Sequence, residues 1–185
     1  MSPYNELGQR RLLDTLEHRV AHEREWTTSV TEEIRITSES SRSDLARRLL
    51  QRYYHELALR FPNGFEPGHA AVAQLHEYAP PGGIFLVAFL SDAPIGCGAL
   101  RRFDDNTAEV KRMWVDPVAR GRGVGRGLLR ELEASGVALG YQRLCLDTSA
   151  HLPEAVALYR SAGFDEVPDY NNNPEAAFWF RRDIR

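Results

Sequence analysis

The segment VARGRGVGRGLL at residues 118–129 places four glycines and three arginines between a predicted strand and a predicted helix. Glycine inside a helix costs about 1 kcal/mol relative to alanine, so this density of glycine needs a compensating reason. A hinge, a basic patch and a ligand-binding loop are the three explanations. A strand, a glycine loop and a helix in this order place free backbone donors at a helix N-terminus, where the helix dipole favours an anion. The segment therefore predicts an α/β unit with an anion site at its turn.

The hydrophobic pattern of the remaining chain predicts antiparallel strands first and strand–helix–strand units later. Strands are expected at 32–38, 84–90, 95–103, 107–115, 142–147, 164–167 and 176–182. Helices are expected from Ser43 or Asp44 to Phe61, near 70–78, at 123–139 and at 153–162. The predicted fold class is α/β, a mostly antiparallel mixed sheet of about seven strands flanked by helices.

The N-terminal segment stands apart from this domain, so we divide the chain into residues 1–30 and a domain at 31–185. Apolar residues recur at helical spacing between residues 5 and 26, which predicts an amphipathic helix that docks or forms a homodimer: Leu12, Leu13, Leu16 and Val20. His18 and His22 are four residues apart, as a metal pair would be, but two solvated histidines on a charged face are the simpler interpretation.

Composition narrows the classes of partner and compartment. The 185 residues carry a net charge of −3, which gives no electrostatic reason to expect nucleic acid or a membrane as a partner. Cys97 and Cys145 lie in apolar runs without ligands at metal-binding spacing, which favours buried thiols, no metal and a reducing cytoplasm. The polar start is no signal peptide, and the longest apolar run, Ile84–Leu90, is too short to span a bilayer.

Two nucleotide-binding motifs fail on the glycine segment. No Gly-Lys-Ser/Thr triplet follows, as a P-loop requires, and the glycines do not have dinucleotide-fingerprint spacing. The remaining pattern is Arg-x-x-Gly-x-Gly at 120–125. With its flanks, AEVKRMWVDPVARGRGVGRGLL, it resembles the pyrophosphate loop of the GNAT superfamily of acyl-CoA-dependent N-acetyltransferases. AVALYRSAGF at 155–164 resembles the later helix–turn–strand of that family, and the resemblance covers residues 32–184.

The resemblance implies a sheet splayed at the cofactor site and transfer of acetyl from acetyl-CoA to a primary amine in a ternary complex. The acceptor is expected to be a small molecule or amino-acid-like; a non-catalytic acyl-CoA sensor is the alternative. Since Leu152 stands where many relatives carry asparagine, Ser149 is a substitute contact. The residues expected to bind acetyl-CoA are Met113, Trp114, Val115, Arg120, Gly121, Arg122, Gly123, Val124, Gly125, Arg126 and Ser149.

Two residues are candidates for the chemistry. Glu109 matches the position of a general base in some members, and three roles stay open for it: base, carboxylate that orients the acceptor, and ion pair with Lys111 on the same strand face. Tyr159 matches the tyrosine that faces the sulfur and serves as general acid. The acceptor side is expected to include Tyr53, Phe61, Phe65, Tyr170 and Asn172.

Overall fold

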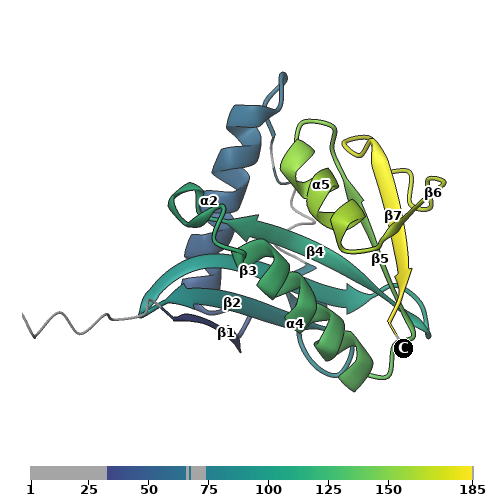
Figure 1. Ribbon diagram of the computed structural model, residues 1–185, viewed down its shortest axis with the longest axis horizontal. Helices are drawn as coiled ribbons and strands as arrows, with labels where there is room; N and C mark the ends of the chain where they lie inside the picture. The colour runs from purple at the N-terminus through teal and green to yellow at the C-terminus, as the bar shows by residue number, and fades with distance from the viewer. Residues whose placement is uncertain (1–32, 66, 68–73, 185) are drawn as a thin grey trace, which may run out of the picture. The chain divides into compact units, whose positions relative to one another are not determined.

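The computed structural model describes residues 33–65, 67 and 74–184, which form one sheet with helices packed on both of its faces (Figure 1). The helix predicted at 5–26, with His18 and His22, lies outside the described residues. The strands are β1 (Ile34–Ser38), β2 (Ile84–Leu90), β3 (Ala93–Arg102), β4 (Thr107–Val115), β5 (Arg143–Thr148), β6 (Asp165–Val167) and β7 (Phe178–Asp183). The helices are α2 (Asp44–Arg60), α4 (Val124–Ala138) and α5 (Pro153–Ser161), with 3₁₀ turns η1 (Gln74–Tyr78) and η2 (Pro117–Ala119).

The sheet has the order β1-β2-β3-β4-β5-β7-β6, and every neighbouring pair is antiparallel except β4 and β5. That parallel pair is short, because only Thr107–Glu109 pairs with Arg143–Cys145. Beyond Glu109 the two strands diverge, and residues 110–115 have no described strand beside them on that edge. The predicted seven-stranded mixed sheet and its splay are therefore confirmed.

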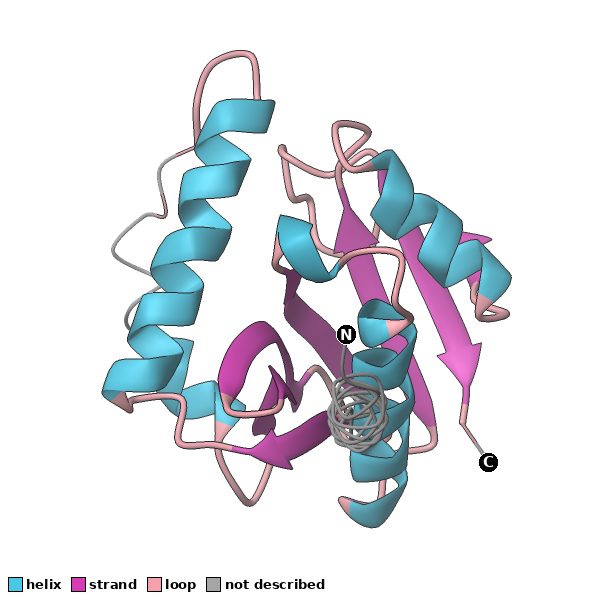
Figure 2. Cartoon of the chain, turned by 60° about the vertical axis from the view of Figure 1, so that its left-hand side comes forward, coloured by secondary structure: helices cyan, strands magenta, loops and turns pink. Residues whose placement is uncertain are grey.

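Alternating side chains of β2 separate the core into two clusters. Phe85 and Val87 pack with Leu49 of α2, whereas Leu86 and Ala88 belong to the cluster around α4 and α5. Because successive strand residues point to opposite faces, this alternation seats α2 on one face and the other two helices on the opposite face (Figure 2).

Local signals explain where the elements begin and end. The Ser43 hydroxyl accepts a hydrogen bond from the Ala46 amide at 3.1 Å and caps α2, which ends before Pro62. The helix expected near 70–78 is in the described part only the five-residue η1. The last strand starts at Phe178 rather than residue 176, because the Ala176 amide bonds to the Asn173 carbonyl at 3.1 Å in a turn.

Both cysteines are free and buried, as the sequence predicts. Burial raises the pKa of the Cys97 and Cys145 thiols to about 12, so both are protonated at neutral pH. Within the described ranges, no helix is long and apolar enough to cross a membrane.

Candidate active site

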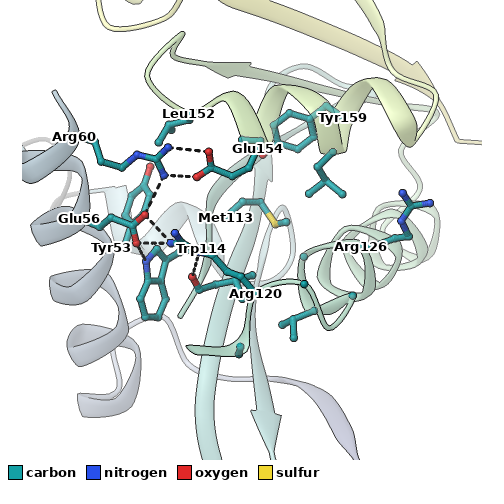
Figure 3. Close-up of a pocket in the computed structure, with 18 of the residues that line it drawn as sticks. Tyr53, Glu56, Arg60, Met113, Trp114, Arg120, Arg126, Leu152, Glu154 and Tyr159 are labelled. Atoms are coloured by element: carbon teal, nitrogen blue, oxygen red, sulfur yellow. Dashed lines mark hydrogen bonds and ion pairs between the residues drawn. The ribbon is translucent and has the colours of Figure 1, made fainter. Parts of the chain in front are cut away.

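A cavity of about 320 Å³ lies between the end of β4, the glycine loop, α2 and α5 (Figure 3). Most of the residues predicted to bind acetyl-CoA line it: Met113, Trp114, Val115, Arg120, Gly121, Gly123, Val124, Gly125 and Arg126. Two predicted residues do not line it. Arg122 borders a separate surface hollow beside Ile34 and Ile36 of β1, and Ser149 lines a second cavity described below.

The glycine loop has the backbone that its sequence predicts. Gly121 and Gly123 have φ of +77° and +81°, a region that glycine adopts at little cost and other residues avoid. A Cβ on either would meet no atom within 4 Å, so open space, not packing, surrounds both. Gly123 caps α4 without a side chain, so the amides of the first helical turn are free of a side-chain cap. This geometry suits an anion that must approach the backbone closely.

Two of the loop arginines are already engaged within the protein. The Arg120 Nη2 lies 2.5 Å from Oε2 of Glu56, and its Nε donates to the Val115 carbonyl at 3.0 Å. Arg126 donates from Nη2 to the Ser161 hydroxyl at 3.0 Å. A phosphate contact from Arg120 would therefore have to compete with a carboxylate of α2.

Glu56 is the centre of a network that joins α2, β4 and α5 (Figure 3). It accepts from the Trp114 indole at 2.8 Å and from Arg60 Nη1 at 3.1 Å, and Arg60 also bonds Glu154 of α5 from Nη2 at 2.8 Å. Burial raises the pKa of Glu56, but the hydrogen bonds from Arg120, Trp114 and Arg60 outweigh burial and hold that pKa below its ordinary value. The sequence signals only one pair of this network, Glu56 and Arg60, which are four residues apart on a helix; the other members are far apart in the chain.

A second cavity, of about 440 Å³, adjoins the first. The two share a wall made of Tyr53, Leu57, Met113, Leu152, Ala155 and Tyr159. Three of the predicted acceptor residues line the second cavity: Tyr53, Phe61 and Phe65. Tyr170 and Asn172 do not, although Asn171 and Asn173 beside Asn172 do. A turn at 169–173 exposes Asn172 and turns its two neighbours to Asp147, which explains the difference.

Tyr159 lines both cavities and is buried. Its hydroxyl makes no hydrogen bond to any described residue, so its proton is available to a bound molecule. Burial raises the pKa of this phenol above its ordinary value, which keeps the hydroxyl protonated at neutral pH. The residue is therefore a hydrogen-bond donor at the contact between the two cavities.

Glu109 is fully buried and lines neither cavity. Arg101 Nε lies 2.7 Å from one of its oxygens, and Lys111 Nζ lies 3.0 Å from the other. The Tyr170 hydroxyl donates to it at 3.3 Å. Of the three roles left open, this geometry favours the ion pair. The sequence reasoning missed Arg101, although a cross-strand signal existed, since Arg101 is the direct register partner of Glu109.

Comparison with known proteins identifies the family. Residues 46–164 match the Acetyltransferase (GNAT) family. The chain belongs to this family. An IAA acetyltransferase of Azospirillum brasilense is 36% identical over 149 residues, which cover 78% of this chain and 95% of that protein. The human N-acetylaspartate synthetase is 37% identical over 99 residues, 52% of this chain and 33% of that protein.

Solved structures agree on the fold. A GNAT acetyltransferase of Staphylococcus aureus Mu50 superposes with a TM-score of 0.70 at 20% identity, over 83% of this chain and 100% of that chain. A GNAT acetyltransferase of Elizabethkingia anophelis with acetyl-CoA bound gives 0.60 at 20% identity, over the same shares. The family and the named acetyltransferase relatives together show that the protein is an acetyl-CoA-dependent acetyltransferase.

Proposed function

We propose that this enzyme transfers the acetyl group of acetyl-CoA to the primary amine of a small-molecule or amino-acid-like acceptor, with both substrates bound at once. The observation that carries the proposal is the pair of cavities that meet at Tyr159 and Met113. When two substrates are bound in adjoining cavities, their reacting atoms are held close together. The reaction then proceeds within one complex and needs no encounter between free molecules. The relatives support a small acceptor, since one is named for an N-acetylated amino acid.

The first cavity fits the acyl donor. The left-handed glycines and the start of α4 form the cradle for the diphosphate, where a Cβ would occupy the space that the anion needs. The unpaired edge of β4, residues 110–115, supplies backbone groups for the pantetheine arm, a role that the family resemblance implies for Met113 and Val115. Together these features direct the thioester toward the wall that both cavities share.

In the chemical step, the amine nitrogen bonds to the acetyl carbon as the carbon–sulfur bond breaks. One proton leaves the amine and one reaches the sulfur. Phenol has a reference pKa of about 10 against about 8.5 for a thiol, so full proton transfer from Tyr159 is uphill by about 2 kcal/mol. Burial, which raises the pKa of Tyr159, adds to this difference. We therefore assign Tyr159 a hydrogen bond that stabilises the departing sulfur.

Glu109 acts in this proposal as a positioning residue. It holds Lys111, whose Nζ also lies 2.5 Å from Asp147 Oδ1, and so ties β4 to β5 where the strands begin to separate. A direct base would have to reach the amine, and Glu109 lines neither cavity. The proton of the amine then passes to water in the second cavity.

The decisive experiment supplies acetyl-CoA with a panel of primary amines and measures thiol release and acetylated product. The proposal expects turnover with small amines and intersecting kinetic patterns. Tight binding of acetyl-CoA with no thiol release for any amine would overturn the proposal and indicate the non-catalytic sensor instead.

A further inference from the structure

A bulge in β4 changes which side chains reach the second cavity. Opposite β3, Cys97 pairs with Trp114 and Ala99 with Lys111, so Gly98 faces both Arg112 and Met113. Arg112 has φ of +57°, a costly backbone for a residue other than glycine. Consecutive residues of a regular strand alternate between faces, but the bulge reverses the alternation: Val110 packs in the cluster around α4, whereas Trp114 packs in the cluster around α2. Arg112 accordingly lies with Tyr54 and Tyr78 of the second cluster, and it lines the second cavity. The bulge thus places a cation in the wall of the second cavity, whereas regular alternation would turn this side chain to the other face of the sheet.

Arg112 differs from the other cations that line this cavity. Arg101 pairs with Glu77 and Glu109, and Lys111 pairs with Glu109 and Asp147. Arg112 forms no ion pair with any described residue, and its buried Nε has no hydrogen-bond partner. A guanidinium stays charged, and a half-buried charge without a counter-ion is costly. Among the residues that the structure describes, the positive charge of Arg112 is therefore unmatched.

The surroundings of Arg112 keep it in position without neutralising it. Its guanidinium carbon lies 5.4 Å from the centre of the Tyr54 ring and 5.8 Å from that of Tyr78, within the range of a cation–π contact. The hydroxyls of both tyrosines are buried and likewise have no hydrogen-bond partner in the described part of the chain. These aromatic contacts hold the cation, and they leave its Nε–H without a hydrogen-bond partner among the described residues. An anion with two oxygens in a plane is the ligand that a guanidinium binds best.

The location of Arg112 separates the acceptor from the acyl donor. Arg112 lines the second cavity and not the first, so it does not face the diphosphate cradle. Tyr159, beside which the amine must bind, lines the same cavity. The cavity also has an aromatic wall, in which the centre of the Phe65 ring lies 6.1 Å from that of Tyr54 and 5.5 Å from that of Phe61. One molecule with an amine, a carboxylate and an apolar portion would contact all three.

We propose that Arg112 binds a carboxylate of the acceptor, so that the substrates of this enzyme are primary amines that carry a carboxylate, the amino acid class. This inference rests on the proposed acetyltransferase function and names the acceptor for it. Arg112 is then a specificity-determining residue, and the bulge in β4 brings its side chain to the acceptor cavity.

The test with the wild-type enzyme compares matched pairs of acceptors that differ only in the carboxylate: phenylalanine with phenethylamine, leucine with isoamylamine, and phenylalanine with its methyl ester. We expect kcat/KM to favour the carboxylates by about 10- to 100-fold, the range for a hydrogen bond to a charged group. Equal use of both members of each pair would overturn the inference and leave the proposed function intact.

The matched variants are Arg112→Met and Arg35→Met. Arg35 is also a strand arginine over an aromatic ring, 4.5 Å from the centre of Phe89, but it lines neither cavity. Arg112→Met should reduce the preference for carboxylates to near unity while the KM for acetyl-CoA and turnover of the decarboxylated amines persist. Arg35→Met should keep the wild-type preference. A preference retained in Arg112→Met would refute the role of Arg112.

Two further readouts keep the outcomes distinct. If Arg112→Met does not fold, as shown by its melting curve, the matched pairs on the wild-type enzyme still decide the question. If no amine of any kind releases thiol, the proposed function fails. In that case the shift in melting temperature with CoA plus phenylalanine, compared with CoA plus phenethylamine, tests the carboxylate site by itself. An equal shift for both would overturn it.

Discussion

Gly123 allows the sharpest test of the diphosphate cradle. Replacing it with glutamate forces a Cβ residue into φ of +81°, at a cost of about 1–2 kcal/mol. No atom lies within 4 Å of the new Cβ, so steric clash adds nothing and the domain should fold. At 2–4 °C per kcal/mol for a chain of this size, the melting temperature should fall by about 2–8 °C.

The affinity of Gly123→Glu for acetyl-CoA should fall much further than its free energy of unfolding. A glutamate carboxylate about 6 Å from a phosphate charge, at an effective dielectric of about 20, repels it by about 3 kcal/mol. That energy corresponds to a loss of about 100-fold in the affinity for acetyl-CoA per pair of charges. Isothermal titration calorimetry with acetyl-CoA measures the loss directly.

Gly140 provides a control at the other end of the same helix. Its φ is +91° and a Cβ there would also meet nothing within 4 Å, so Gly140→Glu introduces the same backbone strain and the same charge. The helix dipole disfavours a negative charge at this end by about 0.3–1 kcal/mol, so this variant should be the less stable of the two. Its affinity for acetyl-CoA should match the wild type. Wild-type affinity for acetyl-CoA in both variants would refute the cradle, and so would a loss of affinity of the same size in both.

Three other perturbations address the remaining groups. Tyr159→Phe should lower kcat by about 10- to 100-fold, the worth of a hydrogen bond to a charged group, with little change in the Kd for acetyl-CoA; an unchanged kcat would remove the residue from the chemistry. Glu109→Gln should destabilise the fold by about 3 kcal/mol, because the half-buried Arg101 and Lys111 each lose one of two counter-charges. The same variant should leave the shape of the kcat–pH profile unchanged; loss of a basic limb in that profile would restore the role of general base. Since burial raises the pKa of Cys97 and Cys145 to about 12, a thiol reagent at pH 8 should find neither in the native enzyme and both after unfolding; rapid labelling of the native protein would contradict their burial.

The fold was largely predictable because its local signals agree with its tertiary structure. The strands at 84–90 and 107–115 have the predicted bounds, and the left-handed Gly123 is the N-cap of α4 at the glycine loop. The helical stretch expected near 70–78 is, in its described part, the 3₁₀ turn η1, since apolar spacing cannot distinguish a 3₁₀ turn from an α-helix.

The site was predictable only where a contiguous motif carries it. The glycine loop and Tyr159 line the cavities as the family pattern implies. Arg112 could not be found, because the strand pattern assigns residues to faces by alternation and a bulge breaks that rule. Ser149 was expected beside the acyl donor but lines the second cavity, since a side chain after β5 is placed by the direction of that strand and not by its distance from a motif.

The early end of the β4–β5 ladder has a consequence for inhibition. Because only Thr107–Glu109 pairs with β5, no continuous sheet separates the first cavity from the second, and the two adjoin at Tyr159. A single compound that joins the thiol of the donor to a carboxylated amine would span both. Such a hybrid loses translational and rotational freedom once on binding, whereas two separate ligands each lose it. The hybrid should therefore bind far more tightly than either half alone.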